Sequence, residues 1–186
     1  KTGAELGCHV MYSGGAGGNG DGGVGRTAQF LDKMNEGGRR MTSVCHTRPS
    51  GAMFGLAQST PFRNSPWKEL MALPTIADRV VALKDPATRE RLISRSKEAG
   101  FRADPALLRP MGMGDVPDYD MGRENSLEQL AARQGKDPVE VYVDRLIESE
   151  GRELWNFWAF GGALENQWAY MKMDHCVPML ADAGAH

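Results

Sequence analysis

The chain has 186 residues, of which 41% are hydrophobic and 25% charged, values typical of a globular domain with a hydrophobic core. A formal net charge of -2 gives no basic field for nucleic acid, and no apolar run reaches the roughly 18 residues of a membrane span. We expect a cytoplasmic protein without a membrane or nucleic-acid partner, of unknown oligomeric state; the absence of a visible signal peptide adds nothing to this expectation.

The first elements follow the order strand, helix, strand. Residues 6–12 are predicted to form a strand, and a glycine-rich loop over residues 13–25 follows it. A short helix is predicted over residues 26–36, because its apolar residues recur on one face and two glycines end it. Residues 41–47 form a second predicted strand. This order and its short connections predict a right-handed βαβ unit and a parallel sheet.

From Arg48 the pattern becomes irregular and then helical. Helical segments are predicted after Pro66, over residues 76–83 and 86–99, from Ser126, from Asp137 to about residue 150, and over residues 164–173. Two of these helices begin with Asp-Pro, which places proline at the first helical position. The aromatic residues 154–160 fit a strand or a helix. A last apolar strand starts at Val177 and leads into Asp182.

Each of the three cysteines adjoins a histidine, in the pairs Cys8-His9, Cys45-His46 and His175-Cys176. Neighbouring side chains on a strand point to opposite faces, so at most one member of each pair reaches a shared site. The spacing lacks C-x₂-C, which disfavours a zinc knuckle, and an odd number of distant cysteines disfavours a disulfide scaffold. Buried structural thiols are therefore predicted.

Polar groups are expected at three strand ends: His9, the Thr47-Arg48 pair and Asp182. In a (β/α)₈ barrel the carboxyl ends of all parallel strands meet on the face that holds the active site. An imidazole and a carboxylate are groups that a hydrolytic zinc site uses, because the metal acidifies bound water and a carboxylate takes the proton. A histidine on a strand is also a common core residue, so both interpretations of His9 stay open.

Segments along nearly the whole chain resemble one family, in the same order. The closing Leu180-Ala-Asp-Ala-Gly-Ala-His186 resembles the last-strand motif of the N-acyl-D-amino-acid deacylases of the amidohydrolase superfamily, which usually have serine at the position of Ala181. Residues 43–56 are similar to the family's strand before an inserted lobe. Further similar segments are Pro61-Phe, Pro66-Trp, residues 83–89, Pro117-Asp-Tyr, residues 126–131 and Gly135-Lys-Asp-Pro.

The resemblance implies an α/β fold that is the C-terminal part of a (β/α)₈ TIM-type barrel. Two βα units would span residues 1–48, a mainly helical insertion residues 49–175, and the last barrel strand residues 176–186. It implies a zinc-dependent enzyme, with one or two ions, that hydrolyses the amide bond of small N-acyl amino acids, D enantiomers in particular, or related amides. We expect the chain to be a fragment that is inactive alone, with most zinc ligands outside it.

The resemblance also implies roles for single residues. Asp182 matches the aspartate that binds near the metal and serves as general base, then as acid to the leaving amine. His9 matches a histidine zinc ligand, although the family often has Ser-His where this chain has Cys-His. Arg48 is expected to bind a substrate carboxylate in a bidentate pair, or alternatively to pair with a structural acid, and Ser50 to line the pocket.

Two other functions stay open. The segment Gly18-Asn-Gly-Asp-Gly-Gly23 satisfies the G-x-G-x-x-G pattern of dinucleotide-binding oxidoreductases. The loop before its first glycine is long, however, and no acidic residue ends the next strand to hold a ribose; a flexible loop over a barrel mouth explains the same glycines. The other alternative is a truncated barrel segment that packs or binds without catalysis.

Overall fold

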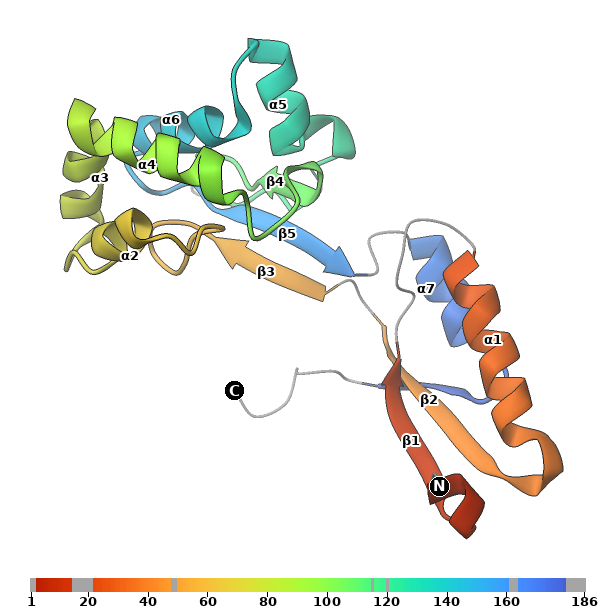
Figure 1. Ribbon diagram of the computed structural model, residues 1–186. Helices are drawn as coiled ribbons and strands as arrows, with labels where there is room; N and C mark the ends of the chain where they lie inside the picture. Colours follow the sequence, from red (N-terminus) through yellow and green to blue (C-terminus); the bar gives the residue numbers. More distant parts are fainter. Residues whose placement is uncertain are drawn as a thin grey trace. The chain divides into compact units, whose positions relative to one another are not determined.

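The computed structural model describes residues 3–14, 22–47, 50–114, 116–119, 121–160 and 164–179. In these residues the chain is α/β, with helices and two three-stranded sheets (Figure 1). It divides into a parallel-sheet unit, Lys1–Gly51 with Trp158–His186, and a helical unit, Ala52–Phe157. Each unit has its own hydrophobic core. In the part of the chain that is described, every helix is too short or too polar to cross a membrane.

The parallel-sheet unit contains three parallel strands in the order β1-β2-β6. The strand β1 (His9–Gly14) leads through α1 (Gly22–Asn35) to β2 (Arg40–His46), and β6 (Cys176–Met179) pairs with the other side of β2. The predicted βαβ unit and the predicted strand around Val177 are confirmed.

The first strand starts later than predicted, at His9. Residues Gly3–Leu6 form a 3-10 helix instead, and Gly7 follows it with a φ of 78°. Glycine adopts this left-handed backbone without the steric cost that a Cβ brings. The chain therefore turns at Gly7 and becomes extended only from His9 onward.

Asn35 joins the end of α1 to the start of β2. Its side-chain Nδ2 donates to the carbonyl oxygens of Leu31 (2.8 Å) and Met41 (2.9 Å), and its Oδ1 accepts from the Met41 N–H at 2.8 Å. A 3-10 turn, Glu36–Gly38, makes the connection, with Gly37 at a φ of 72°. One amide side chain thus satisfies groups of both the helix and the strand.

One face of the parallel sheet is covered by α1 and α7 (Leu164–Met171). Phe30 of α1 packs edge-on against Tyr12 of β1, with ring centroids 6.2 Å apart. Tyr170 of α7 is fully buried and contacts Ser43 of β2. Figure 1 shows the two helices side by side next to these strands.

Among the described residues, no helix covers the opposite face of the same sheet. Because side chains alternate along a strand, Met11, Val44 and Val177 lie on this face, away from the two α-helices. Met11 is 60% exposed and Val177 48% exposed. His9, Arg40 and Thr42 share this face, which is therefore mixed in polarity. A parallel sheet normally has both faces covered, so the exposure of its apolar residues is unusual.

The helical unit contains α2 (Ser65–Met71), α3 (Ile76–Lys84), α4 (Pro86–Ala99), α5 (Leu127–Gln134) and α6 (Pro138–Glu148). These helices confirm the helical segments predicted from the sequence. Asp85 and Asp137 cap α4 and α6 by accepting from main-chain N–H groups of the first turn, so both Asp-Pro pairs act as helix starts.

A second sheet has the order β3-β5-β4, from β3 (Ser50–Phe54), β5 (Trp155–Phe160) and β4 (Leu108–Pro110). The segment left open between strand and helix is thus the strand β5. Neither β3 nor β4 was predicted: β3 has no β-branched residue, and β4 has only three residues and ends in proline. Their strand conformation depends on pairing with β5.

Candidate functional site

Only some of the predicted site residues lie within the described part of the chain. Asp182 and Arg48 lie outside the described residues, as do residues 15–21 of the glycine-rich loop. Ser50 is the first residue of β3. The last described residue of β6, Met179, pairs with His46 at the carboxyl end of β2. The roles predicted for Asp182, Arg48 and Ser50 stay predictions.

His9 lies at the amino edge of the parallel sheet. It begins β1 and pairs with Arg40, the first residue of β2. The prediction that His9 ends a strand is therefore wrong, because the residues before it form the 3-10 helix. The Nε2 atom of His9 lies 2.8 Å from the Thr42 hydroxyl oxygen. The carboxyl edge, by contrast, is formed by Gly14, His46 and Met179.

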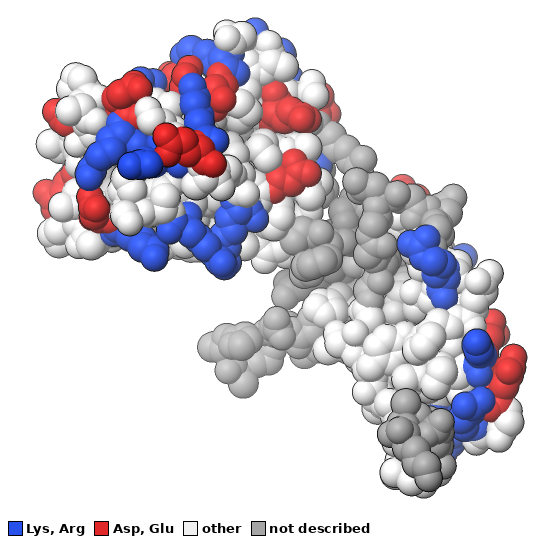
Figure 2. Space-filling model, in the orientation of Figure 1, with Lys and Arg blue, Asp and Glu red and all other residues white. Residues whose placement is uncertain are grey.

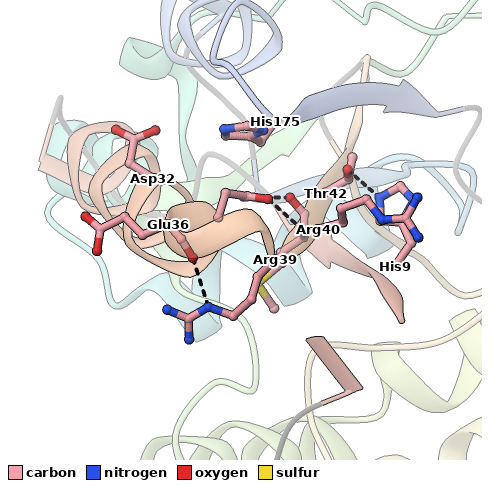
Figure 3. Close-up of a pocket in the computed structure, with 9 residues that line it drawn as sticks. His9, Asp32, Glu36, Arg39, Arg40, Thr42 and His175 are labelled. Carbon is pink, nitrogen blue, oxygen red and sulfur yellow. Dashed lines mark hydrogen bonds between the residues drawn. The ribbon is translucent and has the colours of Figure 1, made fainter. Parts of the chain in front are cut away.

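A pocket of about 500 Å³ opens beside His9 at this amino edge (Figure 3). Figure 3 shows Asp32 and Glu36 on the helix side of the pocket and His9 on the strand side. Arg39 also lines the pocket, and its Nε donates to the Glu36 carbonyl oxygen at 3.1 Å. In parallel α/β sheets ligands bind outside the carboxyl ends of the strands, so this pocket at the amino edge is a weak candidate for an active site.

His175, which also lines the pocket, comes from the turn before β6. Its φ is 60°, a left-handed backbone that few residues other than glycine adopt. Its carbonyl oxygen accepts from the Ser43 N–H at 2.9 Å. The turn thereby fixes where β6 begins to pair with β2.

The donor set for a zinc ion is incomplete in the described ranges. Among these residues, no three His, Cys, Asp or Glu side chains gather closely enough to hold a metal ion. Zinc in proteins takes three or four such ligands. The described residues therefore do not make a zinc site by themselves.

A buried hydroxyl pair lies under α7. The Ser43 Oγ and Tyr170 Oη atoms are 2.7 Å apart, and both side chains are fully buried. Burial raises the pKa of Tyr170 to about 12. The hydrogen bond with Ser43 acts in the opposite direction and lowers this pKa. Gly14 is required beside the pair, because a Cβ there would overlap both oxygens. Sequence reasoning missed this pair; a serine in the middle of the predicted strand 41–47 was the available signal.

The cysteines fall into two groups. Cys45 is fully buried on the helix-covered face and Cys176 is half-buried beside it, which confirms the prediction of buried thiols for Cys45. Burial, together with the neighbouring Cys45, raises the pKa of Cys176 to about 12, which favours the protonated thiol at neutral pH. Cys8 is exposed, and the prediction of burial is wrong there because it precedes the sheet.

Comparisons of the chain with models of protein families, with curated proteins and with solved structures found no match. The resemblance to the deacylases therefore rests on the similar sequence segments alone, of which residues 43–56 and the closing residues 180–186 are the most extensive. Membership of that family is accordingly a proposal for this chain.

Proposed function

We propose that the chain forms part of the (β/α)₈ barrel of an amidohydrolase that cleaves the amide bond of small N-acyl amino acids. The observation that carries this proposal is the parallel sheet with helices on one face and exposed Met11 and Val177 on the other. A barrel wall has this construction, because helices cover its outer face and the strands opposite cover its inner face. A doubly wound sheet would have helices on both faces.

The neighbour relations of the strands also favour a barrel. In a barrel each parallel strand pairs with the next one along the chain. Here β6 pairs with β2, although the whole helical unit lies between them in the sequence. The helical unit is then an insertion between two consecutive barrel strands, as the resemblance implies.

In this proposal Asp182 is the group that transfers protons. It lies three residues beyond Met179, whose partner His46 ends β2 at the carboxyl edge. A carboxylate at this edge would take a proton from the attacking water and deliver it to the leaving nitrogen. Arg48, two residues beyond His46, would bind the carboxylate of the acyl amino acid, and Ser50 would line the same pocket.

Zinc belongs to the proposal through the resemblance alone. His9 begins its strand at the amino edge, away from the edge to which the proposal assigns Asp182. The described residues do not bring a ligand set together. We therefore expect the zinc ligands outside the described residues and derive no step of the reaction from the metal.

Asp182→Asn tests the proposal in the protein made from the complete reading frame. We expect turnover of N-acyl-D-amino acids to fall by about 10²–10⁴-fold, because the amide cannot accept the proton. Circular dichroism and zinc content should stay unchanged. The matched control is Asp174→Asn, an exposed residue of the turn before β6, which should keep its activity. Full activity in Asp182→Asn, or a wild type inactive on every N-acyl amino acid tried, would contradict the proposal.

A further inference from the structure

Arginine side chains of the helical unit are mostly paired inside the unit. Carboxylates pair with Arg89, Arg91, Arg95 and Arg145, and carbonyl oxygens accept from Arg79, Arg133 and Arg152. Arg109 is buried and has an interaction of its own. Among the described arginine side chains of this unit, Arg63 and Arg102 differ from the others, because they have neither an ion pair nor a hydrogen bond.

The two unpaired arginines line the same pocket, which has a volume of about 350 Å³. The loop before α2 and the loop after α4 are held together there, because the Arg102 N–H donates to the Pro61 carbonyl oxygen at 2.8 Å. Below them the rings of Phe62 and Phe101 pack with centroids 4.7 Å apart. The backbone thus holds two exposed guanidinium groups at one hollow with no carboxylate among its lining residues.

A second pocket of about 620 Å³ shares Arg63, Asn64 and Ala99 with the first. It runs between α2 and α4, where Arg91 pairs with Glu69 at 2.9 Å and Arg95 pairs with Glu98 at 2.8 Å. We call the two pockets together the basic groove. Its four arginines and two glutamates leave two positive charges, although the chain carries a net charge of -2. Figure 2 shows Lys and Arg gathered along one edge of this unit.

The chemistry of the basic groove fits carboxylates. A guanidinium forms bidentate hydrogen bonds with a carboxylate, and two unpaired guanidiniums that line one hollow favour an anion there. The groove is long, and its rim is open: the Arg95 and Glu98 side chains are each 63% exposed. Small-molecule sites are instead mostly apolar and enclose most of their ligand.

We propose that the basic groove binds an acidic peptide segment of a partner protein, with two of its carboxylates paired to Arg63 and Arg102. The segment would continue past Arg91 and Arg95 along α2 and α4. This binding is independent of the proposed amide hydrolysis, because every residue of the groove belongs to the helical unit.

Fluorescence anisotropy of a labelled hexaglutamate peptide, titrated with the full chain at about 0.15 M ionic strength, tests the proposal. The double variant Arg63→Gln, Arg102→Gln should raise the Kd at least about tenfold, because each arginine loses charge-assisted hydrogen bonds. The control Lys68→Gln, Lys84→Gln removes the same charge from exposed lysines outside the groove. It should change the Kd less than about twofold, as expected for screened charges.

Two results would overturn the proposal. An equal loss of affinity in the two double variants would mean that the peptide responds to net charge and not to the basic groove. Displacement of the peptide by an equimolar amount of inorganic phosphate would mean that the groove takes a small anion instead. Thermal melts of both double variants should match the wild type, because all four side chains are exposed.

Discussion

The ion pair of Arg145 and Glu153 is the most buried charged contact in the described part of the helical unit. The Glu153 side chain is fully buried, and its Oε2 lies 2.7 Å from the Arg145 Nη2. Burial raises the pKa of Glu153, and Arg145 together with the Gly112 N–H acts against that rise. Because the Glu153 side chain is fully buried, water cannot replace Arg145 as the partner of its carboxylate.

Glu153→Gln should lower the free energy of unfolding by about 3–5 kcal/mol, because the partly buried Arg145 charge would lose its counter-ion. Urea unfolding followed by circular dichroism measures this loss. The control is Glu98→Gln, because the side chains of Glu98 and its partner Arg95 are each 63% exposed. This variant should lose less than about 1 kcal/mol of unfolding free energy. Equal losses in the two variants would mean that Glu153 is not buried as described.

Tyr170 makes stability depend on pH in the alkaline range. Its pKa rises from 10.0 to about 12 on folding, so the unfolded chain loses the phenol proton first as the pH increases. The stability that the neutral phenol contributes is full below pH 10.0 and is lost as the pH rises to about 12. Urea unfolding across this window should show a smaller loss for Tyr170→Phe than for the wild type. Parallel losses in both proteins would contradict the raised pKa.

At the scale of elements, short sequence patterns predicted the helices. The strands depend instead on pairing between segments that are far apart in the sequence. Asp-Pro at residues 85–86 and 137–138 gave two helix starts, because capping involves only the first turn. The three residues of β4 become a strand only by pairing with β5, which no local pattern reveals. The Ser43–Tyr170 contact joins residues 127 positions apart, so the sequence offered no way to pair them.

The residues of the candidate site also differ in how well the sequence alone predicts them. The closing motif around Asp182 is continuous in the sequence and could be recognised there. The edge on which His9 lies depends on where β1 starts, and this start is set by the turn at Gly7. A shift of a few residues in one strand boundary moved His9 from the predicted carboxyl edge to the amino edge.

Gly14→Ala tests how tightly α7 packs on the sheet. We expect it to lower the free energy of unfolding by about 1–3 kcal/mol, because the new Cβ overlaps the buried oxygens of Ser43 and Tyr170. Gly25→Ala is the matched control: no atom lies within 4 Å of its Cβ position, and it is inside α1. It should stabilise the protein by about 0.5–1 kcal/mol. A neutral Gly14→Ala would contradict the close contact.

At the scale of the whole molecule, the open face of the parallel sheet links the fold to the proposed function. Met11 and Val177 are about half exposed, so leaving them in water forgoes roughly half of the 1.5–3 kcal/mol that complete burial of such a side chain contributes. Closing the sheet into a barrel would bury this face against further strands. The proposed enzyme therefore requires that the face be covered in the protein made from the complete reading frame.

Peptide-level mass spectrometry after mild peroxide oxidation measures directly whether this face of the sheet is covered. Met11, 60% exposed in this chain, should oxidise readily in residues 1–186 alone and become protected in the complete protein. Met53, 40% exposed in the helical unit, is the internal reference and should oxidise in both samples. Equal oxidation of Met11 in the two samples would mean that the face stays open, and the barrel and the amidohydrolase proposal built on it would be wrong.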